Sequence, residues 1–326
     1  MVHAKIIGTG SYAPEQILTN HDLEKRVKTS HDWIVERTGI HERRIAAKDE
    51  VTSDLAVKAG ERTIQAAGIA PSEIDLIIVA TTTPDMLFPS TACTVQRRLG
   101  ATNAFAFDLA AACSGFVYAL SVGAQYIASR TVKKALVIGA DMLSRFVNWE
   151  DRTTCVLFGD GAGAVLLSPT QDNDGILSTS LCSDGQLWDL ITIPGGGTAD
   201  PPSEQMLIEK RNTVKMRGEE TFRAAVRAME EIALSTLEQN KIAATDLACI
   251  IPHQANLRII KAVAKRLNLP MDRVIVNLDR YGNTSAASIP LALDEAVRDG
   301  RICQGGLVLL LAFGSGLTWG STLIKW

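Results

Sequence analysis

Cys113 stands where an apolar stretch meets a run of small residues. Residues 104–107 (Ala-Phe-Ala-Phe) predict a strand, and Cys113 follows three alanines and opens a helix-like stretch that continues to residue 119. A thiol at such a turn lies beside the partial positive charge and free N–H groups of a helix N-terminus, which favour the thiolate. We therefore predict that Cys113 is a nucleophile, although the shape of the motif alone leaves a buried structural cysteine as an alternative.

Two further residues are candidate partners of this thiol, since a nucleophilic cysteine usually has a base or a polarising group nearby in space. Of the five histidines, only His253 lies beyond residue 41, and it ends a predicted strand, where catalytic groups of α/β folds gather. Asn283 follows another predicted strand, residues 274–278. The competing interpretations are a structural histidine and a simple glycine–asparagine turn.

Two glycine-rich stretches are candidate binding loops. Residues 158–163 (Phe-Gly-Asp-Gly-Ala-Gly) are followed by a predicted strand instead of a helix, which excludes a dinucleotide-binding loop. Gly314 follows the predicted strand at residues 307–311, where a tight turn offers a backbone N–H that can bind an oxyanion. A purely structural glycine is the alternative.

The elements that must position these residues occur in the same order in both halves of the chain. A helix-like stretch at residues 53–67, ending at Gly68, leads into an apolar strand at residues 74–80. Apolar residues at helical spacing over residues 222–237 lead into a strand at residues 245–251. Corresponding positions lie 171 residues apart, which predicts an internal duplication.

The duplication predicts an α/β protein made of two halves, residues 1–172 and 173–326. Alternating strands and helices imply mainly parallel sheets with helices on both faces. Asn283 lies 170 residues after Cys113, so we expect the two to occupy corresponding positions and to face each other across a pseudo-twofold axis. Residues 190–215 are expected to form a long inserted loop.

The composition excludes several classes of protein. The 326 residues are 46% hydrophobic and 21% charged with a net charge of −3, so no global excess of positive charge indicates nucleic-acid binding. No uncharged apolar run reaches the length of about 18 residues that a membrane span needs. The six cysteines are scattered without close pairs, unlike a disulfide framework or a zinc knuckle. With no leader-like start, we expect a cytoplasmic protein.

Four motifs together resemble those of the β-ketoacyl-acyl-carrier-protein synthase III family, the initiating condensing enzymes of type II fatty acid synthesis, which have the thiolase fold. The motifs are Ala112-Cys113-Ser114-Gly115, residues 252–256 (Pro-His-Gln-Ala-Asn), residues 282–288 (Gly-Asn-Thr-Ser-Ala-Ala-Ser) and residues 314–320. The resemblance covers essentially the whole chain. It implies a five-layered αβαβα fold, a homodimer, and a Cys-His-Asn triad, here Cys113, His253 and Asn283.

The resemblance also implies an acyltransferase reaction. An acyl group, expected to be acetyl from acetyl-CoA, passes to Cys113, and the backbone N–H groups of Cys113 and Gly314 hold the oxyanion. Malonyl-acyl-carrier protein then loses carbon dioxide while His253 and Asn283 contact its thioester carbonyl, and condensation gives 3-oxoacyl-acyl-carrier protein. Coenzyme A thioester is a substrate here, and neither a metal nor another cofactor is expected.

Further contacts are implied residue by residue. The residues expected to bind coenzyme A are Trp33, Arg37, Thr38, Arg152, Phe222, Ala255, Asn256 and Arg258. The residues expected to line the acyl pocket are Phe88, contributed by the partner subunit, Leu143 and Phe158. The chain departs from the family pattern at Tyr281, where histidine is frequent, and at Thr153, where glycine is frequent, which leaves the accepted acyl chain length open.

Cationic residues that follow His253 recur at roughly helical spacing, which predicts one basic helix face. They are Arg258, Lys261, Lys265 and Arg266. Because acyl-carrier proteins are acidic, we expect this face to contact the carrier protein; an ordinary solvated helix face is the alternative.

Other functions fit the sequence less well. A polyketide-type condensing enzyme with another starter is the nearest alternative. A thiolase would have a second catalytic cysteine near the C-terminus, and residues 309–326 contain none. A hydroxymethylglutaryl synthase would have a glutamate where the chain has Phe88-Pro89-Ser90, and a non-catalytic carrier-binding scaffold would lack the triad.

Overall fold

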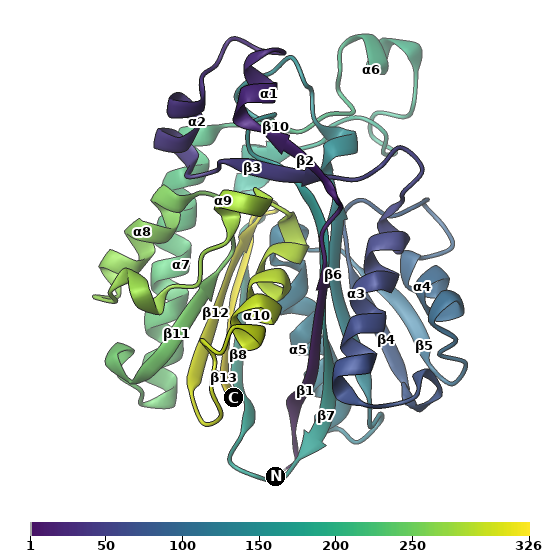
Figure 1. Cartoon of the computed structure of the whole chain (residues 1–326), viewed down its shortest axis with the longest axis vertical. Helices are drawn as coiled ribbons and strands as arrows, with labels where there is room; N and C mark the ends of the chain where they lie inside the picture. The colour runs from purple at the N-terminus through teal and green to yellow at the C-terminus, as the bar shows by residue number, and fades with distance from the viewer. Residues whose placement is uncertain (1) are drawn as a thin grey trace.

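The computed structural model describes residues 2–326 and has five layers, three of helices and two of sheet (Figure 1). The first sheet has the order β1-β7-β6-β4-β5 and the second β11-β12-β13-β8. The strands of the first sheet are β1 (His3–Tyr12), β4 (Leu76–Ala80), β5 (Phe105–Leu109), β6 (Ala135–Met142) and β7 (Asp160–Thr170). Those of the second are β8 (Gly175–Ser183), β11 (Leu247–Pro252), β12 (Leu307–Gly314) and β13 (Thr318–Lys325).

The two sheets repeat one topology. Strands β4, β6, β7 and β1 correspond in position and direction to β11, β12, β13 and β8. The counterpart of β5 is reduced to a single parallel bridge between Ile250 and Val274. The predicted duplication is therefore confirmed as a repeat of topology.

The sheets are mixed, which corrects the expectation of mainly parallel sheets. Pairs β4–β5, β4–β6 and β11–β12 are parallel, whereas β1–β7, β6–β7, β12–β13 and β8–β13 are antiparallel. The reason is clearest between β12 and β13, where only residues 315–317 separate the strands. A connection that short joins antiparallel neighbours, because a parallel pair needs a long crossover.

Six long helices make up the helical layers. Helices α3 (Thr52–Ala67) and α4 (Thr91–Leu99) cover the outer face of the first sheet, and α7 (Gly218–Asn240) and α8 (Leu257–Arg266) cover the second (Figure 1). Helices α5 (Gly115–Ala128) and α10 (Ser288–Arg298) lie between the sheets. Helix α5 carries no charged residue, as expected of a helix enclosed on both sides.

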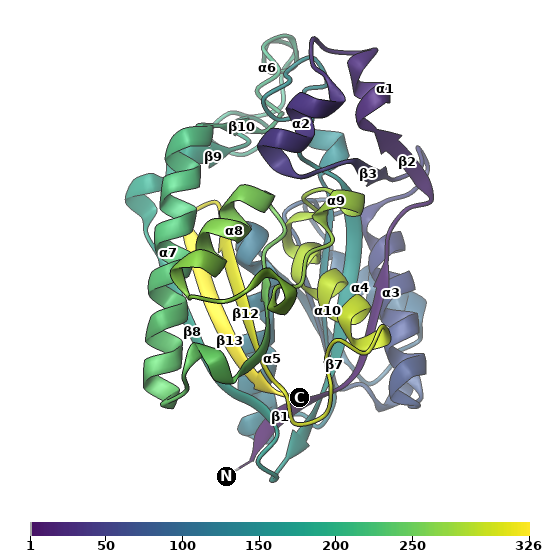
Figure 2. The same cartoon turned by 60° about the vertical axis from the view of Figure 1, so that its left-hand side comes forward.

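A cap of short elements lies over one end of the layers, while both termini lie at the other end (Figure 2). It contains β2 (Gln16–Thr19), β3 (Glu42–Ile45), α1 (Asn20–Glu24), α2 (His31–Thr38) and α9 (Leu278–Tyr281). It also contains β9 (Ile191–Thr192), α6 (Glu204–Ile208) and β10 (Lys215–Met216). The segment 190–215, expected as a loop, thus has structure of its own, since β9 pairs with β10.

Candidate active site

One cavity brings the three predicted catalytic residues together. It has a volume of about 520 Å³ and is lined by Cys113, His253 and Asn283. His253 and Asn283 are buried, whereas Arg37 and Arg258, which line the same cavity, are exposed. The cavity therefore runs from the surface beneath the cap to the thiol.

Cys113 lies in a single 3₁₀ turn, η2 (Ala112–Ser114), directly before helix α5. The preceding Ala112 has φ 46°, a left-handed conformation that is uncommon in residues other than glycine. Gly314, at the end of β12, lies against this turn, because a Cβ atom added there would meet the Cys113 nitrogen at 2.8 Å. The two residues expected to hold an oxyanion are therefore in backbone contact.

The resting thiol is protonated, which corrects the expectation of a thiolate. Burial raises the pKa of Cys113 to about 12, and the negative charge of Asp141 adds to the rise. A hydrogen bond with the Ser285 side chain lowers the pKa but does not compensate. Desolvation of an anion in the cavity outweighs the stabilisation that a helix N-terminus provides.

His253 follows β11, and its backbone N–H donates to the Leu311 carbonyl at 2.8 Å. Its Nδ1 atom lies 2.7 Å from the Ser288 hydroxyl oxygen. Burial lowers the pKa of His253 to about 4, so the imidazole is neutral at physiological pH. Beside it, Gln254 donates to the Pro252 and Ile275 carbonyls, which fixes the end of the strand.

Asn283 is held by backbone contacts on both sides. Its N–H donates to the Leu157 carbonyl at 2.9 Å, and its carbonyl accepts from Gly159 N–H at 3.0 Å. Its side-chain Oδ1 accepts from the Ser285 N–H at 2.9 Å. Because this oxygen is occupied, the amide Nδ2 is the group left to donate to a ligand.

The expected equivalence of Cys113 and Asn283 is wrong by three residues. The turn that corresponds to η2 is η7 (Ser285–Ala287), which begins with Ser285 at φ 52° and leads into α10 as η2 leads into α5. Cys113 therefore corresponds to Ala286. The two turns do meet between the sheets, and a Cβ atom on Gly115 would lie 3.5 Å from the Ala286 Cβ. The prediction from the 170-residue spacing was wrong because it assumed that turns repeat at the spacing of the strands. Corresponding strands lie 171 to 172 residues apart, and this spacing does not determine which residues of the following turns correspond.

Most residues expected to bind coenzyme A line the cavity. They are Trp33, Arg37, Thr38, Phe222, Ala255, Asn256 and Arg258. Arg152 does not line it but lies over the Trp33 ring, with 4.9 Å between guanidinium and ring centroid, while Arg37 lies at 5.0 Å. Two cations thus share one aromatic ring at the opening.

Asn256 ties the two helices beside this opening together. Its Nδ2 donates to the Arg37 carbonyl at the end of α2, at 3.0 Å, and its Oδ1 caps α8 by accepting from the Arg258 N–H at 2.8 Å. The Arg258 guanidinium lies over the Phe222 ring at 5.5 Å. The opening is therefore built jointly by α2, α7 and α8 (Figure 2).

The three expected acyl-pocket residues are not brought together in one chain. Phe158 lines the cavity, Leu143 is buried outside its lining, and Phe88 is 84% exposed. The neighbouring Met86 and Leu87 are exposed as well. Together they form an exposed apolar segment.

The sequence did not predict several residues that line the cavity. They are Val156, Leu157, Ile191, Met216, Gly218, Glu219, Thr221, Ala225, Met229, Ile259 and Phe313, and the cavity is also lined by Thr153, which the sequence marked only as a departure from the family pattern. Several of these residues belong to helix α7. The periodicity of residues 222–237 predicts this helix but does not indicate that it lines the cavity. Asp141 was missed too: its buried carboxylate accepts from Thr82 N–H at 2.8 Å and from Ala286 N–H at 3.1 Å, which joins the two halves.

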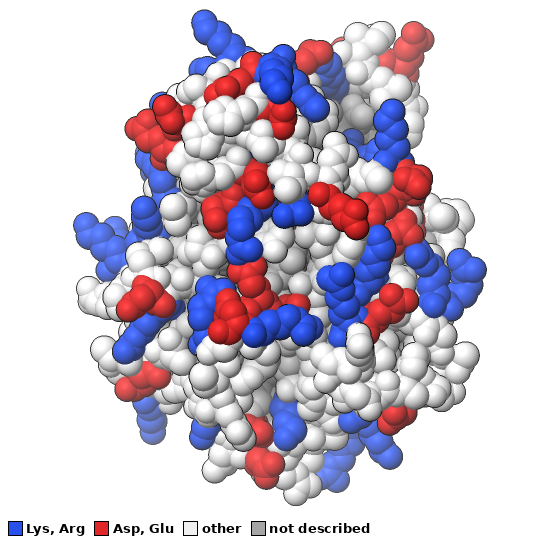
Figure 3. Space-filling model, in the orientation of Figure 1, with Lys and Arg blue, Asp and Glu red and all other residues white. Residues whose placement is uncertain are grey.

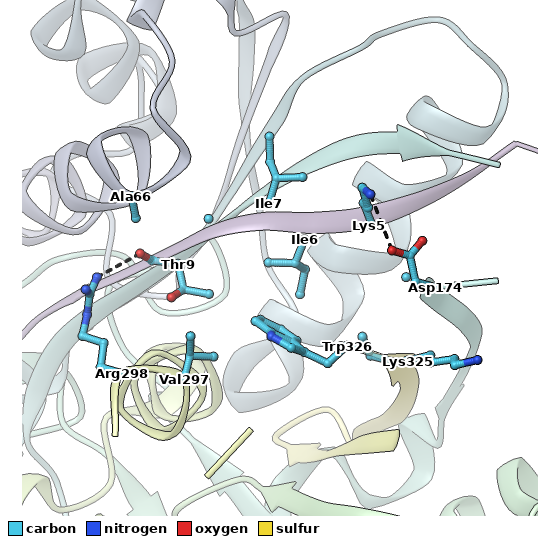
Figure 4. Close-up of a pocket in the computed structure, with 13 residues that line it drawn as sticks. Lys5, Ile6, Ile7, Thr9, Ala66, Asp174, Val297, Arg298, Lys325 and Trp326 are labelled. Atoms are coloured by element: carbon cyan, nitrogen blue, oxygen red, sulfur yellow. Dashed lines mark hydrogen bonds and ion pairs between the residues drawn. The ribbon is translucent and has the colours of Figure 1, made fainter. Parts of the chain in front are cut away.

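A second cavity of about 300 Å³ lies at the opposite end, between β1, α10 and the C-terminal residues (Figure 4). It contains none of the predicted site residues. Its charged groups are largely paired within the chain: Lys5 with Asp174 at 3.5 Å, and Arg298 with the Thr9 carbonyl at 3.1 Å. This arrangement leaves little free charge for a ligand.

The predicted basic face is present on α8, beside the opening. Arg258, Lys261, Lys265 and Arg266 are exposed, and Arg266 lies 3.7 Å from Glu230. In Figure 3, cationic side chains gather at the left-hand edge, where α8 lies, whereas both signs of charge mix over the rest of the visible face. A local basic surface thus exists on a molecule of net negative charge.

Residues 2–326 contain neither a membrane-spanning helix nor a cluster of metal ligands. No helix there combines the length and apolar character needed to cross a membrane. Over the same residues, no group of three or more His, Cys, Asp or Glu side chains is arranged to hold a metal ion.

Comparison with known proteins gives consistent results over the whole chain. Two family models match, described as 3-oxoacyl-[acyl-carrier-protein] synthase III at residues 107–185 and its C-terminal part at residues 237–326. A β-ketoacyl-[acyl-carrier-protein] synthase III of Desulfitobacterium hafniense is 52% identical over 100% of this chain and 98% of the relative.

Solved structures of similar proteins match nearly the whole chain. A 3-oxoacyl-[acyl-carrier-protein] synthase III from Aquifex aeolicus is 48% identical with a TM-score of 0.92, covering 99% of this chain and 100% of that one. The priming β-ketosynthase of the R1128 polyketide pathway is 34% identical with a TM-score of 0.91, covering 98% and 95%. The five-layered thiolase-like fold is thereby confirmed, and the chain belongs to the β-ketoacyl-acyl-carrier-protein synthase III family.

Proposed function

We propose that the cavity performs both half-reactions of a decarboxylative Claisen condensation on Cys113. Family membership makes the chain a condensing acyltransferase that initiates fatty acid synthesis from an acyl-CoA and malonyl-acyl-carrier protein. What remains to be assigned is the role of each residue. The observation that carries the assignment is that Cys113 shares one cavity with two neutral hydrogen-bond donors, His253 and Asn283.

In the first half-reaction, the Cys113 sulfur attacks the carbonyl carbon of acetyl-CoA. The new C–S bond forms as the thioester bond to coenzyme A breaks, and the thiol proton leaves with coenzyme A. The backbone N–H groups of Cys113 and Gly314 hold the transient oxyanion, which their close contact supports. Because the resting thiol is protonated, its proton must be removed as the sulfur attacks.

In the second half-reaction, malonyl-acyl-carrier protein places its thioester carbonyl against His253 and Asn283. Carbon dioxide leaves, and the electron pair it gives up delocalises onto the thioester oxygen as an enolate. The His253 Nε2–H and the Asn283 Nδ2–H donate to that oxygen. The enolate carbon then attacks the acyl carbon and expels the Cys113 thiolate, which takes up a proton. No electron transfer is involved, and the proposal includes no metal or redox cofactor.

The cavity opening fits a coenzyme A tail. The Trp33 ring offers a stacking face for the adenine, and the guanidinium groups of Arg37, Arg152 and Arg258 offer bidentate donors for phosphates. The basic face of α8 is proposed to receive the acidic carrier protein.

A homodimer and a cytoplasmic location are also part of the proposal. β5 is an edge strand of its sheet, Phe105 on it is 45% exposed, and the apolar segment at Met86–Phe88 is exposed too. Such an unpaired edge beside apolar surface supports self-association, with Phe88 entering the cavity of the partner subunit. All six cysteines are free thiols, which suits a reducing compartment.

The test is mass spectrometry of the protein after incubation with a panel of acyl-CoAs. We expect an acetyl adduct on the peptide containing Cys113, and no adduct on the Cys113→Ser variant, because a serine hydroxyl has no thiol reactivity without a strong base. An adduct on another cysteine in Cys113→Ser contradicts the assignment. Loading by a longer or branched acyl group in preference to acetyl favours a polyketide-type starter, the alternative that the 34% identical priming ketosynthase suggests.

A further inference from the structure

Ser288 is the side chain that contacts the far side of the His253 ring. It opens helix α10, is 1% exposed, and its hydroxyl oxygen lies 2.7 Å from Nδ1 of His253, which is 4% exposed. Ser288 does not line the cavity, so it cannot touch a substrate there. Any effect on the reaction must pass through the imidazole ring.

The tautomer of His253 determines whether Ser288 or the imidazole donates the hydrogen bond in this contact. The Ser288 oxygen already accepts a long hydrogen bond from the Gln254 N–H, at 3.4 Å. If His253 carried its proton on Nδ1, that N–H would also point at Ser288. The Ser288 hydroxyl hydrogen would then have no acceptor within residues 2–326.

In the other tautomer, the Ser288 hydroxyl, His253 Nδ1 and the Gln254 N–H all have a hydrogen-bond partner. With the His253 proton on Nε2, the Ser288 O–H donates to the free lone pair of Nδ1, and the Ser288 oxygen still accepts from Gln254. A buried polar hydrogen without an acceptor is costly, so the surroundings select this tautomer. Asn283 is oriented by an analogous contact, since the Ser285 N–H occupies its Oδ1.

We propose that Ser288 is a positioning residue that fixes His253 in the Nε2–H tautomer, so that the ring presents a donor to the thioester oxygen. The inference rests on the proposed function of His253 and adds a residue to it. In the other tautomer, Nε2 would present a lone pair to the enolate oxygen and repel it. Both decarboxylation and condensation should therefore depend on the Ser288 hydroxyl, whereas loading of Cys113 should depend on it much less.

The test compares Ser288→Ala, which removes the donor, with Ser288→Thr, which retains it. We expect Ser288→Ala to slow release of labelled carbon dioxide from malonyl-acyl-carrier protein by roughly 10- to 100-fold, as when groups that orient catalytic side chains are removed. Ser288→Thr should recover most of that rate. Ser321→Ala is the matched control, because this buried hydroxyl bonds Thr236 at 2.6 Å and does not line the cavity.

A second measurement reports the tautomer itself. Nitrogen-15 NMR of protein labelled at histidine, with His253→Asn identifying the signal, distinguishes Nε2–H from Nδ1–H. We expect Nε2–H in the wild type and a mixture or the Nδ1–H form in Ser288→Ala. A merely structural role for Ser288 would leave this signature unchanged.

The outcomes separate the two proposals. An Nδ1–H signal in the wild type overturns the inference even if Ser288→Ala does not fold. Full decarboxylation by a folded Ser288→Ala variant overturns it as well. If His253→Ala itself decarboxylates normally, the proposed function of His253 fails instead.

Discussion

Burial raises the pKa of Cys113 and lowers that of His253, and both shifts favour the uncharged form of the group. The thiol pKa rises to about 12 and the imidazole pKa falls to about 4, so both groups are uncharged at neutral pH. The pair is therefore not a resting thiolate–imidazolium pair. A neutral imidazole suits donation to an enolate, because it needs no proton from solvent.

The first prediction separates the half-reactions. Cys113→Ala should fail to condense yet still decarboxylate malonyl-acyl-carrier protein slowly, because the thiol does not contact the enolate oxygen. His253→Ala and Asn283→Ala should form the acyl-Cys113 adduct but lose decarboxylation by on the order of a hundredfold or more, as when one oxyanion donor is removed.

Labelled carbon dioxide release and adduct mass should be measured on all three variants. If His253→Ala blocks acylation as completely as Cys113→Ala while sparing decarboxylation, His253 is only a base for the thiol, and the proposed roles are wrong.

The second prediction concerns pH. An unfolded histidine titrates near pH 6.5, whereas the pKa of folded His253 is lowered to about 4. The unfolded chain therefore binds a proton first as pH falls, so the stability from neutral His253 is complete above pH 6.5 and is lost progressively toward pH 4. The loss should be on the order of a few kcal/mol in the free energy of unfolding.

Because carboxylates also titrate in acid, the free energy of unfolding of the wild type should be compared with that of His253→Asn, by urea unfolding at pH 7 and pH 5. Between pH 7 and pH 5, the free energy of unfolding of the wild type should fall relative to that of the variant. A difference that is independent of pH would show that burial does not hold His253 neutral.

At the scale of elements, α8 serves two surfaces at once. Its first turn, through Asn256 and Arg258, builds the cavity opening, and the exposed cations further along form the basic face. The helix thereby connects the proposed carrier-protein surface to the opening of the cavity.

The third prediction tests that surface. Lys261→Glu combined with Lys265→Glu should raise the KM for malonyl-acyl-carrier protein and leave acetyl-CoA loading nearly unchanged, because neither lysine lines the cavity. The expected increase is on the order of tenfold at low salt and smaller at high salt, since salt screens exposed charges.

Lys48→Glu combined with Lys133→Glu is the matched control, because both lysines are exposed and lie outside α8. Carrier kinetics that do not change in the α8 variant across a salt series would contradict the proposed contact.

At the scale of the whole molecule, the corresponding turns of the two halves, η2 and η7, have different roles in the proposed chemistry. The first-half turn carries the thiol, while Ser285 of the second-half turn holds Asn283 in place and Ser288, which opens the helix after that turn, contacts His253. Buried Asp141 links the first half to the second-half turn by accepting from the Thr82 and Ala286 N–H groups. Nucleophile and donors therefore come from separate halves of the fold.

The fourth prediction tests whether Phe88 acts across a dimer. Phe88→Gly should broaden the range of acyl-CoAs that load Cys113. In a mixed dimer of Cys113→Ala with Phe88→Gly, the only reactive thiol faces the wild-type Phe88 if that residue enters the partner's cavity. Loading should then keep the wild-type acyl preference.

Native mass spectrometry of the mixed dimer gives both the oligomeric state and the adduct. A broadened preference in the mixed dimer would place Phe88 in the cavity of its own chain, and a monomeric wild type would contradict the dimer itself.

The sequence alone determined several of the regular elements, because their signals are local, although the strand predicted at residues 274–278 is reduced to a single bridge at Val274. The apolar run at 74–80 became β4, the periodic stretch at 53–67 became α3, and Gly68 ends that helix at φ 66°, as a glycine stop requires. The order of elements and their repeat at 171 residues indicated two duplicated α/β halves, and the resemblance of the motifs implied the thiolase-like fold. The motifs around Cys113, His253 and Asn283 identified three residues that the fold brings into one cavity.

Only the tertiary structure decided what depends on packing between distant segments. The register of the two turns was set by contacts between the sheets, so Cys113 corresponds to Ala286 and not to Asn283. The contact of Ser288 with His253 joins residues 35 positions apart. The charge of Cys113 was predicted wrongly, because desolvation depends on everything that surrounds a group, and its neighbours in sequence reveal only the helix that follows it.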